Sequence, residues 1–394
     1  MVSSSEFYTA DNSNLETKKL EAASDHYKRG NYSAALRLYF SLLNTSASYK
    51  LYYRIGKCFY KMNQIDEARE AFEKSVELES YKNPSYAYLA TLCYKNEDLK
   101  GAIYNWASVF AYKPEDENVC LNLATSYFSR GMKFQSVYYY EKYLKYASEH
   151  GQEYSTIKTS IDKCSQIGNE LLQKAKLSIS RGDNKSAIEL LNFAIKNQPV
   201  SFDINYLLGS TYLLEKDNMR SMIYLKQAYC VNKRSAETLQ KLASASTNLG
   251  DYTTAYCSMK RLLPLVMNNQ SEYLKTLQMI KGLESSFDNK SHLGHKEWGD
   301  KYFEDNNYHF ALIEYENCIL LDESNRSIFS EKIERLKRFI HPEEGIIESC
   351  MEKGKTSYTK GDYRTSNKYF SKVMLLSEEG SPEYKLAKSR VVNV

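Results

Sequence analysis

An internal repeat of about 34 residues constrains this chain more than any other feature of its sequence. In nine segments a small residue is preceded by another small residue twelve positions earlier and followed by a large residue four positions later. The central small residues are Ala35, Ala68, Ala102, Ser136, Ala187, Ser221, Ala255, Ala311 and Ser366. Because all three positions keep their size class in every segment, the sequence predicts one supersecondary unit used nine times.

Each unit has the pattern of two helices joined by a tight turn. In the second unit, apolar residues recur at helical spacing over 51–60 and again over 65–78, with a polar break between them. A residue that tolerates a positive φ is expected to end the first helix. Small residues at the facing positions let the helix axes approach, and the large residue fills the space between neighbouring pairs. One pair cannot bury its second apolar face, so the pairs must stack.

The 34-residue period and the small, small, large pattern resemble tetratricopeptide repeats over roughly residues 16–380. The resemblance implies an all-α fold, namely a tandem helix-hairpin solenoid (a TPR superhelix) of about nine repeats with three insertions. It is specific for the architecture and says little about the activity.

The repeat also predicts where the chain divides. Residues 151–167 either lengthen the first helix of the fifth unit or add a helix. The irregular segments on both sides of the eighth unit predict a hinge that separates 1–269 from 292–394. The expected segments are a flexible N-terminus at 1–15, units 1–4 at 16–150, a helical insertion at 151–167, units 5–7 at 168–269, a linker at 270–291, unit 8 at 292–325, a linker helix at 326–346, unit 9 at 347–380, and a C-terminal tail or cap at 381–394.

Charge and composition argue against several classes of protein. The chain has 53 basic and 49 acidic residues, and no run of five basic residues that would indicate a nucleic-acid partner. No stretch of about 18 apolar residues predicts a membrane span, and residues 1–14 do not have the pattern of a secretory signal. The eight cysteines are widely spread and include no C-x-x-C pair, which favours reduced thiols and a cytoplasmic location.

Three local patterns suggest chemistry, and none supports an enzyme, a cofactor or a metal. Gly354-Lys355-Thr356 ends like a phosphate-binding loop, but Ser349 stands where that motif needs glycine. His292 and His295 have helical metal-ligand spacing, with Glu297 and Asp300 nearby, but no third ligand stands at ligating spacing. The cysteines at 93, 120, 318 and 350 fall at positions that the repeat buries, so we expect inert packing thiols.

The remaining candidate is the groove that the resemblance implies, in which the first helix of each pair lines a concave surface that holds peptides. The candidate binding residues are Tyr53, Lys57, Tyr60, Lys50, Tyr94, Phe128 and Tyr27. Tyrosine offers a rigid face with a polar tip, which suits binding surfaces. Packing explains the four aromatic residues Tyr27, Tyr60, Tyr94 and Phe128 at least as well, whereas Tyr53 and Lys57 are harder to explain as structural.

Some relatives grip chaperone C-termini through a Lys and an Asn in the first helix of a repeat. The nearest match here is Lys296 with Asp300, and a carboxylate there would repel the ligand's carboxylate. In the first unit Leu20 and Ser24 occupy these positions and cannot grip an anion. The sequence therefore argues against a clamp of this kind.

The sequence favours a non-enzymatic scaffold that binds a protein or peptide partner. The alternative is an accessory subunit that recruits substrates to an enzyme formed by other chains. A third possibility, a nucleic-acid-binding helical repeat, is disfavoured by the mixed charge. The residues identify neither the partner nor the oligomeric state.

Overall fold

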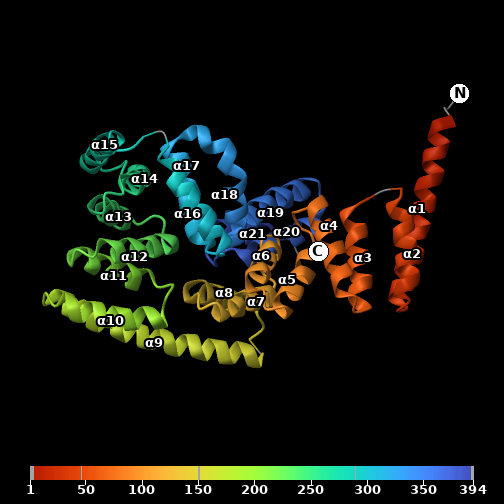
Figure 1. The fold of residues 1–394 in the computed structure, drawn as a ribbon, viewed down its shortest axis with the longest axis horizontal. Helices are drawn as coiled ribbons and strands as arrows, with labels where there is room; N and C mark the ends of the chain where they lie inside the picture. Colours follow the sequence, from red (N-terminus) through yellow and green to blue (C-terminus); the bar gives the residue numbers. More distant parts are fainter. Residues whose placement is uncertain (1–3, 46, 150, 289, 392–394) are drawn as a thin grey trace. The chain divides into compact units, whose positions relative to one another are not determined.

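The computed structural model describes residues 4–391 except 46, 150 and 289, and within this part of the chain it contains helices and no strand. Figure 1 shows the helices. The nine pairs are α1 (Ser4–Lys28) with α2 (Tyr32–Leu43), α3 (Tyr49–Lys61) with α4 (Ile65–Leu78), α5 (Ser85–Lys95) with α6 (Leu99–Phe110), α7 (Glu117–Ser129) with α8 (Lys133–Tyr146), α9 (Gln152–Ser180) with α10 (Asn184–Asn197), α11 (Phe202–Leu214) with α12 (Asn218–Val231), α13 (Ala236–Asn248) with α14 (Tyr252–Leu262), α16 (His292–Glu304) with α17 (Tyr308–Leu321), and α19 (Pro342–Thr359) with α20 (Tyr363–Leu376). The additional helices are α15 (Gln270–Glu284), α18 (Arg326–Ile340) and α21 (Pro382–Arg390). The predicted all-α repeat architecture is confirmed.

The turn within each pair has one residue with a positive φ, as the sequence pattern required. These residues are Gly30, Asn63, Glu97, Gly131, Gly182, Lys216, Gly250, Asn306 and Gly361. The next residue is aspartate in five of the turns, and its carboxylate accepts a hydrogen bond from a backbone N–H in the first turn of the second helix. Local chemistry therefore both ends the first helix and starts the second.

The small residue of the first helix faces the large residue of the second helix. A Cβ atom added at Gly56 would lie 2.6 Å from the ring of Phe72, and one at Gly299 would lie 2.7 Å from the ring of Tyr315. The pattern shifts by one residue in the fourth pair, where Tyr139 is buried and Tyr140 is only half-buried. Close approach of the helices therefore explains why only alanine or glycine stands at this position.

The chain forms two compact units, residues 1–113 and residues 114–394. The hinge expected between 1–269 and 292–394 stays a prediction, and residues 292–394 belong to the same compact unit as residues 114–269. Residues 151–167 lengthen α9, which has 29 residues. The N-terminal residues from Ser4 onward, expected as a flexible segment, belong to α1, and α21 packs Ala387 into the core against α20.

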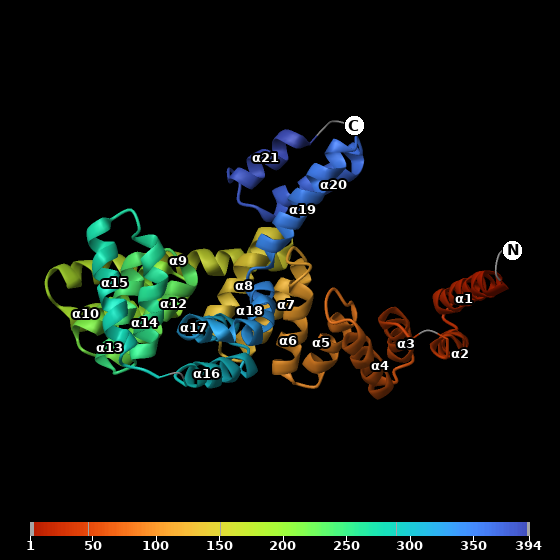
Figure 2. The ribbon, with the colours of Figure 1, turned by 90° about the horizontal axis from the view of Figure 1, so that it is seen from above.

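Within the second unit, α7 and α8 pack against the α16–α17 turn and the α18–α19 junction, and we call this the return interface (Figure 2). Three tyrosine hydroxyls donate hydrogen bonds to backbone carbonyls 179–202 residues further along the chain. The pairs are Tyr127 with Asn306 at 3.0 Å, Tyr138 with Ile340 at 2.6 Å, and Tyr139 with Phe339 at 3.0 Å. These carbonyls lie at or next to helix ends, where intrahelical hydrogen bonds run out, so the tyrosine hydroxyls supply donors to helix ends from a distant part of the sequence.

No helix in the described part of the chain is long and apolar enough to cross a membrane.

Candidate functional site

The candidate surface in residues 1–113 centres on Lys57 of α3. Its Nζ atom lies 4.7 Å from the centre of the Tyr27 ring on α1 and 5.5 Å from the centre of the Tyr53 ring. Each cation–π contact of this kind is worth about 0.5–1 kcal/mol at a partly exposed site. Three of the predicted residues are therefore brought together on the first helices of adjacent pairs.

A fourth residue, Tyr88 on α5, connects this group to the third pair. Its ring makes edge contacts with Tyr53 at 6.0 Å and with Tyr60 at 5.3 Å, and it stacks on Phe72 at 4.7 Å. The sequence interpretation missed Tyr88 because it lies one residue after Ala87, the position in α5 that corresponds by the 34-residue period to Tyr53 in α3. The three tyrosines at 53, 60 and 88 all pack against the core around Phe72.

Burial governs the chemistry of these phenols. It raises the pKa of Tyr27 to about 12, with the neighbouring Tyr88 adding to the effect, and it raises the pKa of Tyr88 to about 12. Burial also raises the pKa of Tyr53, although a hydrogen bond with Tyr88 opposes the rise. The phenols therefore keep their protons at neutral pH and offer hydrogen-bond donors and ring faces.

The other predicted residues are more exposed. Tyr94, on the last turn of α5, has 47% of its surface exposed, and the Lys50 side chain extends from the first turn of α3 into solvent. Phe128 is 65% exposed on α7. It belongs to the second compact unit, whereas the other six residues belong to the first.

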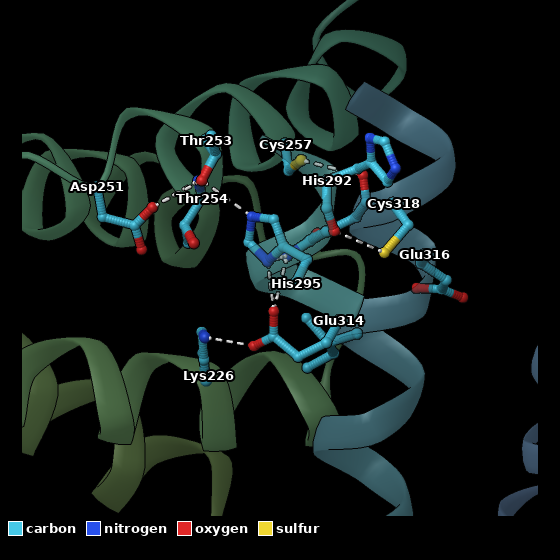
Figure 3. Close-up of polar contacts among 12 residues, drawn as sticks. Lys226, Asp251, Thr253, Thr254, Cys257, His292, His295, Glu314, Glu316 and Cys318 are labelled. Carbon is cyan, nitrogen blue, oxygen red and sulfur yellow. Dashed lines mark hydrogen bonds and ion pairs between the residues drawn. The ribbon is translucent and has the colours of Figure 1, made fainter. Parts of the chain in front are cut away.

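A second polar site lies buried in residues 114–394, where α12, α14, α16 and α17 meet (Figure 3). The Lys226 Nζ atom lies 2.7 Å from one carboxylate oxygen of Glu314, and the His295 Nδ1 atom lies 2.6 Å from the other. The Nε2 atom of His295 lies 2.9 Å from the Thr253 hydroxyl, which donates a hydrogen bond to Asp251. We call these five side chains the buried network.

The carboxyl of Glu314 remains ionised in this interior site. Burial alone would raise its pKa, but the charge of Lys226 and the hydrogen bond with His295 lower the pKa to about 2. The network therefore pairs the buried charges of Lys226 and Glu314, and its hydrogen bonds join the sixth, seventh and eighth helix pairs.

His295, Lys296 and Asp300, which were considered for a metal site or an anion clamp, all have polar partners among the described residues. Both ring nitrogens of His295 have partners, and the described residues contain no group of three or more His, Cys, Asp or Glu side chains arranged to hold a metal ion. Burial opposes ionisation of Asp300, but hydrogen bonds from Lys296, Lys332 and Tyr315 lower its pKa to about 2. The Lys296 ammonium is thus paired with Asp300 at 2.6 Å.

The remaining local patterns lie in helical cores. Gly354 lies inside α19 against the Phe370 ring, and Thr356 donates its hydroxyl proton to the Glu352 carbonyl one turn earlier. All eight cysteines are free, and Cys350 is half-buried rather than buried as expected. Burial raises the pKa of Cys93, and it raises the pKa of both Cys120 and Cys318 to about 12, so these thiols stay protonated.

Comparisons with known proteins match two segments of the sequence to one family. Two tetratricopeptide repeat models match it, one over residues 49–81 and the other over residues 172–237.

Similar solved structures include a tetratricopeptide repeat protein from Parabacteroides merdae, with 13% identity, 68% of this chain and 98% of that chain covered, and a TM-score of 0.32. They also include the TPR domain of P58(IPK), with 14% identity, 95% and 97% covered, and a TM-score of 0.30. The TPR2AB domain of yeast Sti1 in complex with pHSP90 has 12% identity, 69% and 99% covered, and a TM-score of 0.28. At such low TM-scores these similarities say nothing about what the chain binds.

Proposed function

Because this chain is a tetratricopeptide repeat protein, we propose that it is a non-enzymatic scaffold that binds a protein or peptide along the first helices of its three N-terminal pairs. The proposed surface runs over α1, α3 and α5. The observation that carries the proposal is the position of Lys57 between the rings of Tyr27 and Tyr53. Tyr94, almost half exposed, extends this surface on α5.

The charge of the surface favours an acidic or phosphorylated partner segment. Lys50 and Lys57 lie seven residues apart on α3, so they share one face of the helix. Among the described residues neither lysine forms an ion pair. Their charge is therefore available to a ligand, and we expect the attraction to weaken as salt is added. The tyrosine rings supply the apolar contact area.

The competing explanation is that these rings serve only the packing of adjacent pairs. Tyr53 and Tyr60 do contact the core around Phe72, so their replacement by alanine would lower stability whether or not they bind a partner. Lys57 and Tyr94 separate the two explanations better, because a change in their polar or exposed atoms leaves the core intact.

Site-specific photo-crosslinking in the full-length protein tests the proposal. A photoreactive phenylalanine analogue at position 94 should capture a partner in native cells, and the same analogue at position 363 should not. Tyr363 is a matched control, since it is a partly exposed tyrosine on α20 in the other compact unit. The Lys57→Glu variant should lose the product formed at position 94. Equal products from both positions, or a product at 94 that persists in Lys57→Glu, would contradict the proposed surface.

The identity of the captured protein also tests the accessory-subunit alternative. Capture of the subunits of an enzyme complex would favour that role, whereas capture of a single protein without such subunits would favour a scaffold. Mapping the crosslinked peptide shows whether acidic or phosphorylated residues lie next to the attachment point.

A further inference from the structure

A cavity of about 400 Å³ opens within residues 114–394, where α8, α10, α12 and α17 meet. It lies beside the return interface and is distinct from the surface on α1, α3 and α5. Its volume is within the range of small-molecule sites in proteins, which combine apolar walls with a few polar groups.

One polar side chain at this cavity forms no hydrogen bond with any residue that the structure describes. His309 of α17 is only 7% exposed and lines the cavity. Its ring contacts Phe134 at 5.5 Å and Tyr138 at 5.2 Å, both edge to face. In the part of the chain that the structure describes, no hydrogen bond reaches either ring nitrogen. A neutral imidazole has one N–H donor and one acceptor, so the ring nitrogens of His309 are available to a polar group of a ligand.

The walls of the cavity suit a planar ring. Phe134, Tyr224 and Phe310 line it, and all three are half-buried. Phe310 is held by an edge contact with Tyr302 at 5.4 Å, and Tyr224 stacks on Tyr212 at 5.8 Å. These contacts fix the wall rings in place, and fixed aromatic rings favour stacked or edge-on contact with another ring.

The rim of the cavity is basic. Lys133 and Lys196 both line it and are exposed, and no Asp or Glu is among its lining residues. Lys196 lies over the Phe193 ring at 5.0 Å, and neither lysine forms an ion pair with any described residue. A carboxylate at the rim would therefore meet two uncompensated positive charges.

From this arrangement we propose that the cavity binds a planar aromatic carboxylate, with the ring between Phe134, Tyr224 and Phe310, a ring N–H directed to His309, and the carboxylate at Lys133 and Lys196. The ligand is either a free aromatic acid or an aromatic residue beside an acidic residue in a peptide. Both sources present the same chemistry to the cavity.

Indole-3-acetate is the probe for the free acid and N-acetyl-Trp-Asp-amide the probe for the peptide. We expect saturation-transfer NMR to detect at least one of them on the full-length protein, and titration calorimetry to give its Kd. Indole lacks the carboxylate and phenylacetate lacks the ring N–H, so each should bind at least tenfold more weakly than indole-3-acetate if that acid binds. The tighter of the two main probes identifies the source.

Two variants locate the site. Gln227→Trp fills the cavity from α12 without changing a residue of the core, and it should abolish binding. The double variant Lys133→Glu/Lys196→Glu should weaken binding of the carboxylate probes at least tenfold. Lys185→Glu is the matched control, since Lys185 is exposed on α10 outside the cavity, and it should change the Kd less than twofold.

Circular dichroism of each variant confirms that the helices are intact before binding is measured. The proposal is overturned if neither main probe binds the folded wild-type protein at millimolar concentration. It is also overturned if a probe binds folded Gln227→Trp as tightly as wild type, because the probe then occupies another place.

Discussion

Replacing Lys226 by methionine removes the positive charge from the buried network and keeps a side chain of similar length. In the native protein the side chains of Lys226 and Glu314 are 10% and 3% exposed, and their charged atoms are 2.7 Å apart. In the Lys226→Met variant the Glu314 carboxylate stays buried, and its remaining polar partners among the described residues are His295 and Asn317. Loss of one partner of a buried pair leaves an uncompensated charge, which is the costly case.

The pKa of Glu314 sets the scale of the expected loss. A pKa of about 2 in the folded protein, against an ordinary value of 4.5, corresponds to about 3 kcal/mol of stabilisation at neutral pH. Because the folded pKa is lowered, this stabilisation is present above pH 4.5 and is lost as the pH falls towards 2. We therefore expect Lys226→Met to lower the free energy of unfolding of residues 114–394 by about 3 kcal/mol at pH 7.

Urea unfolding followed by tryptophan fluorescence measures this loss. The chain has two tryptophans, Trp106 in α6 and Trp298 in α16. In a Trp106→Phe background, the signal of Trp298 reports on the unit that contains the network. Lys74→Met is the matched control, since Lys74 pairs with Glu70 on the exposed face of α4, where such pairs contribute little.

The reasoning predicts a second result that packing alone does not. In Lys226→Met/Glu314→Gln no buried charge is left unpaired, so much of the lost stability should return. A loss below about 1 kcal/mol in Lys226→Met, or a double variant no more stable than the single one, would refute the assignment of the network as a coupled charge cluster.

Three further expectations concern packing, the return interface and pH. Gly299→Ala places a methyl group 2.7 Å from the Tyr315 ring and should cost about 1–3 kcal/mol by urea unfolding, whereas Gly282→Ala, with open space around it, should not destabilise. Tyr139→Phe removes the hydrogen bond to the Phe339 carbonyl and should cost about 0.5–1.5 kcal/mol, while Tyr363→Phe on the exposed face of α20 should cost little. Burial lowers the pKa of His309 to about 3, so the stability that depends on the neutral imidazole is complete above pH 6.5 and is lost as the pH falls towards 3. The His309→Gln variant should therefore show a smaller fall of Tm between pH 7 and pH 5. An unchanged fall of Tm would show that another group dominates the pH dependence.

The repeat pattern predicted the features of the fold that depend on contacts within one repeat or between neighbouring repeats. Helix pairs, positive-φ turns and buried small residues all depend on contacts between positions within about 34 residues of each other, so the sequence period carries them. The same locality explains the partial success at the candidate surface. Tyr27, Tyr53 and Lys57 lie together because their helices belong to adjacent pairs, and Tyr88 was missed by a displacement of one residue on α5.

The return interface had no such signal, because its contacts join segments 172–203 residues apart and a period of 34 residues says nothing about them. The abundance of tyrosine does indicate this interface once the hydrogen bonding of buried helix ends is considered. A buried helix end needs donors for its last carbonyls, and a tyrosine hydroxyl can supply one from a neighbouring helix while its ring fills the core. Tyr138 and Tyr139 do this for α18 from consecutive positions, which explains why the tyrosine run at 138–140 tolerates one residue out of phase with the repeat. A run of aromatic residues that departs from the repeat register therefore indicates contact with a segment outside the local stack. In this chain that contact joins α8 to α18 within the second unit, and the ring of Tyr138 also packs against the ring of His309.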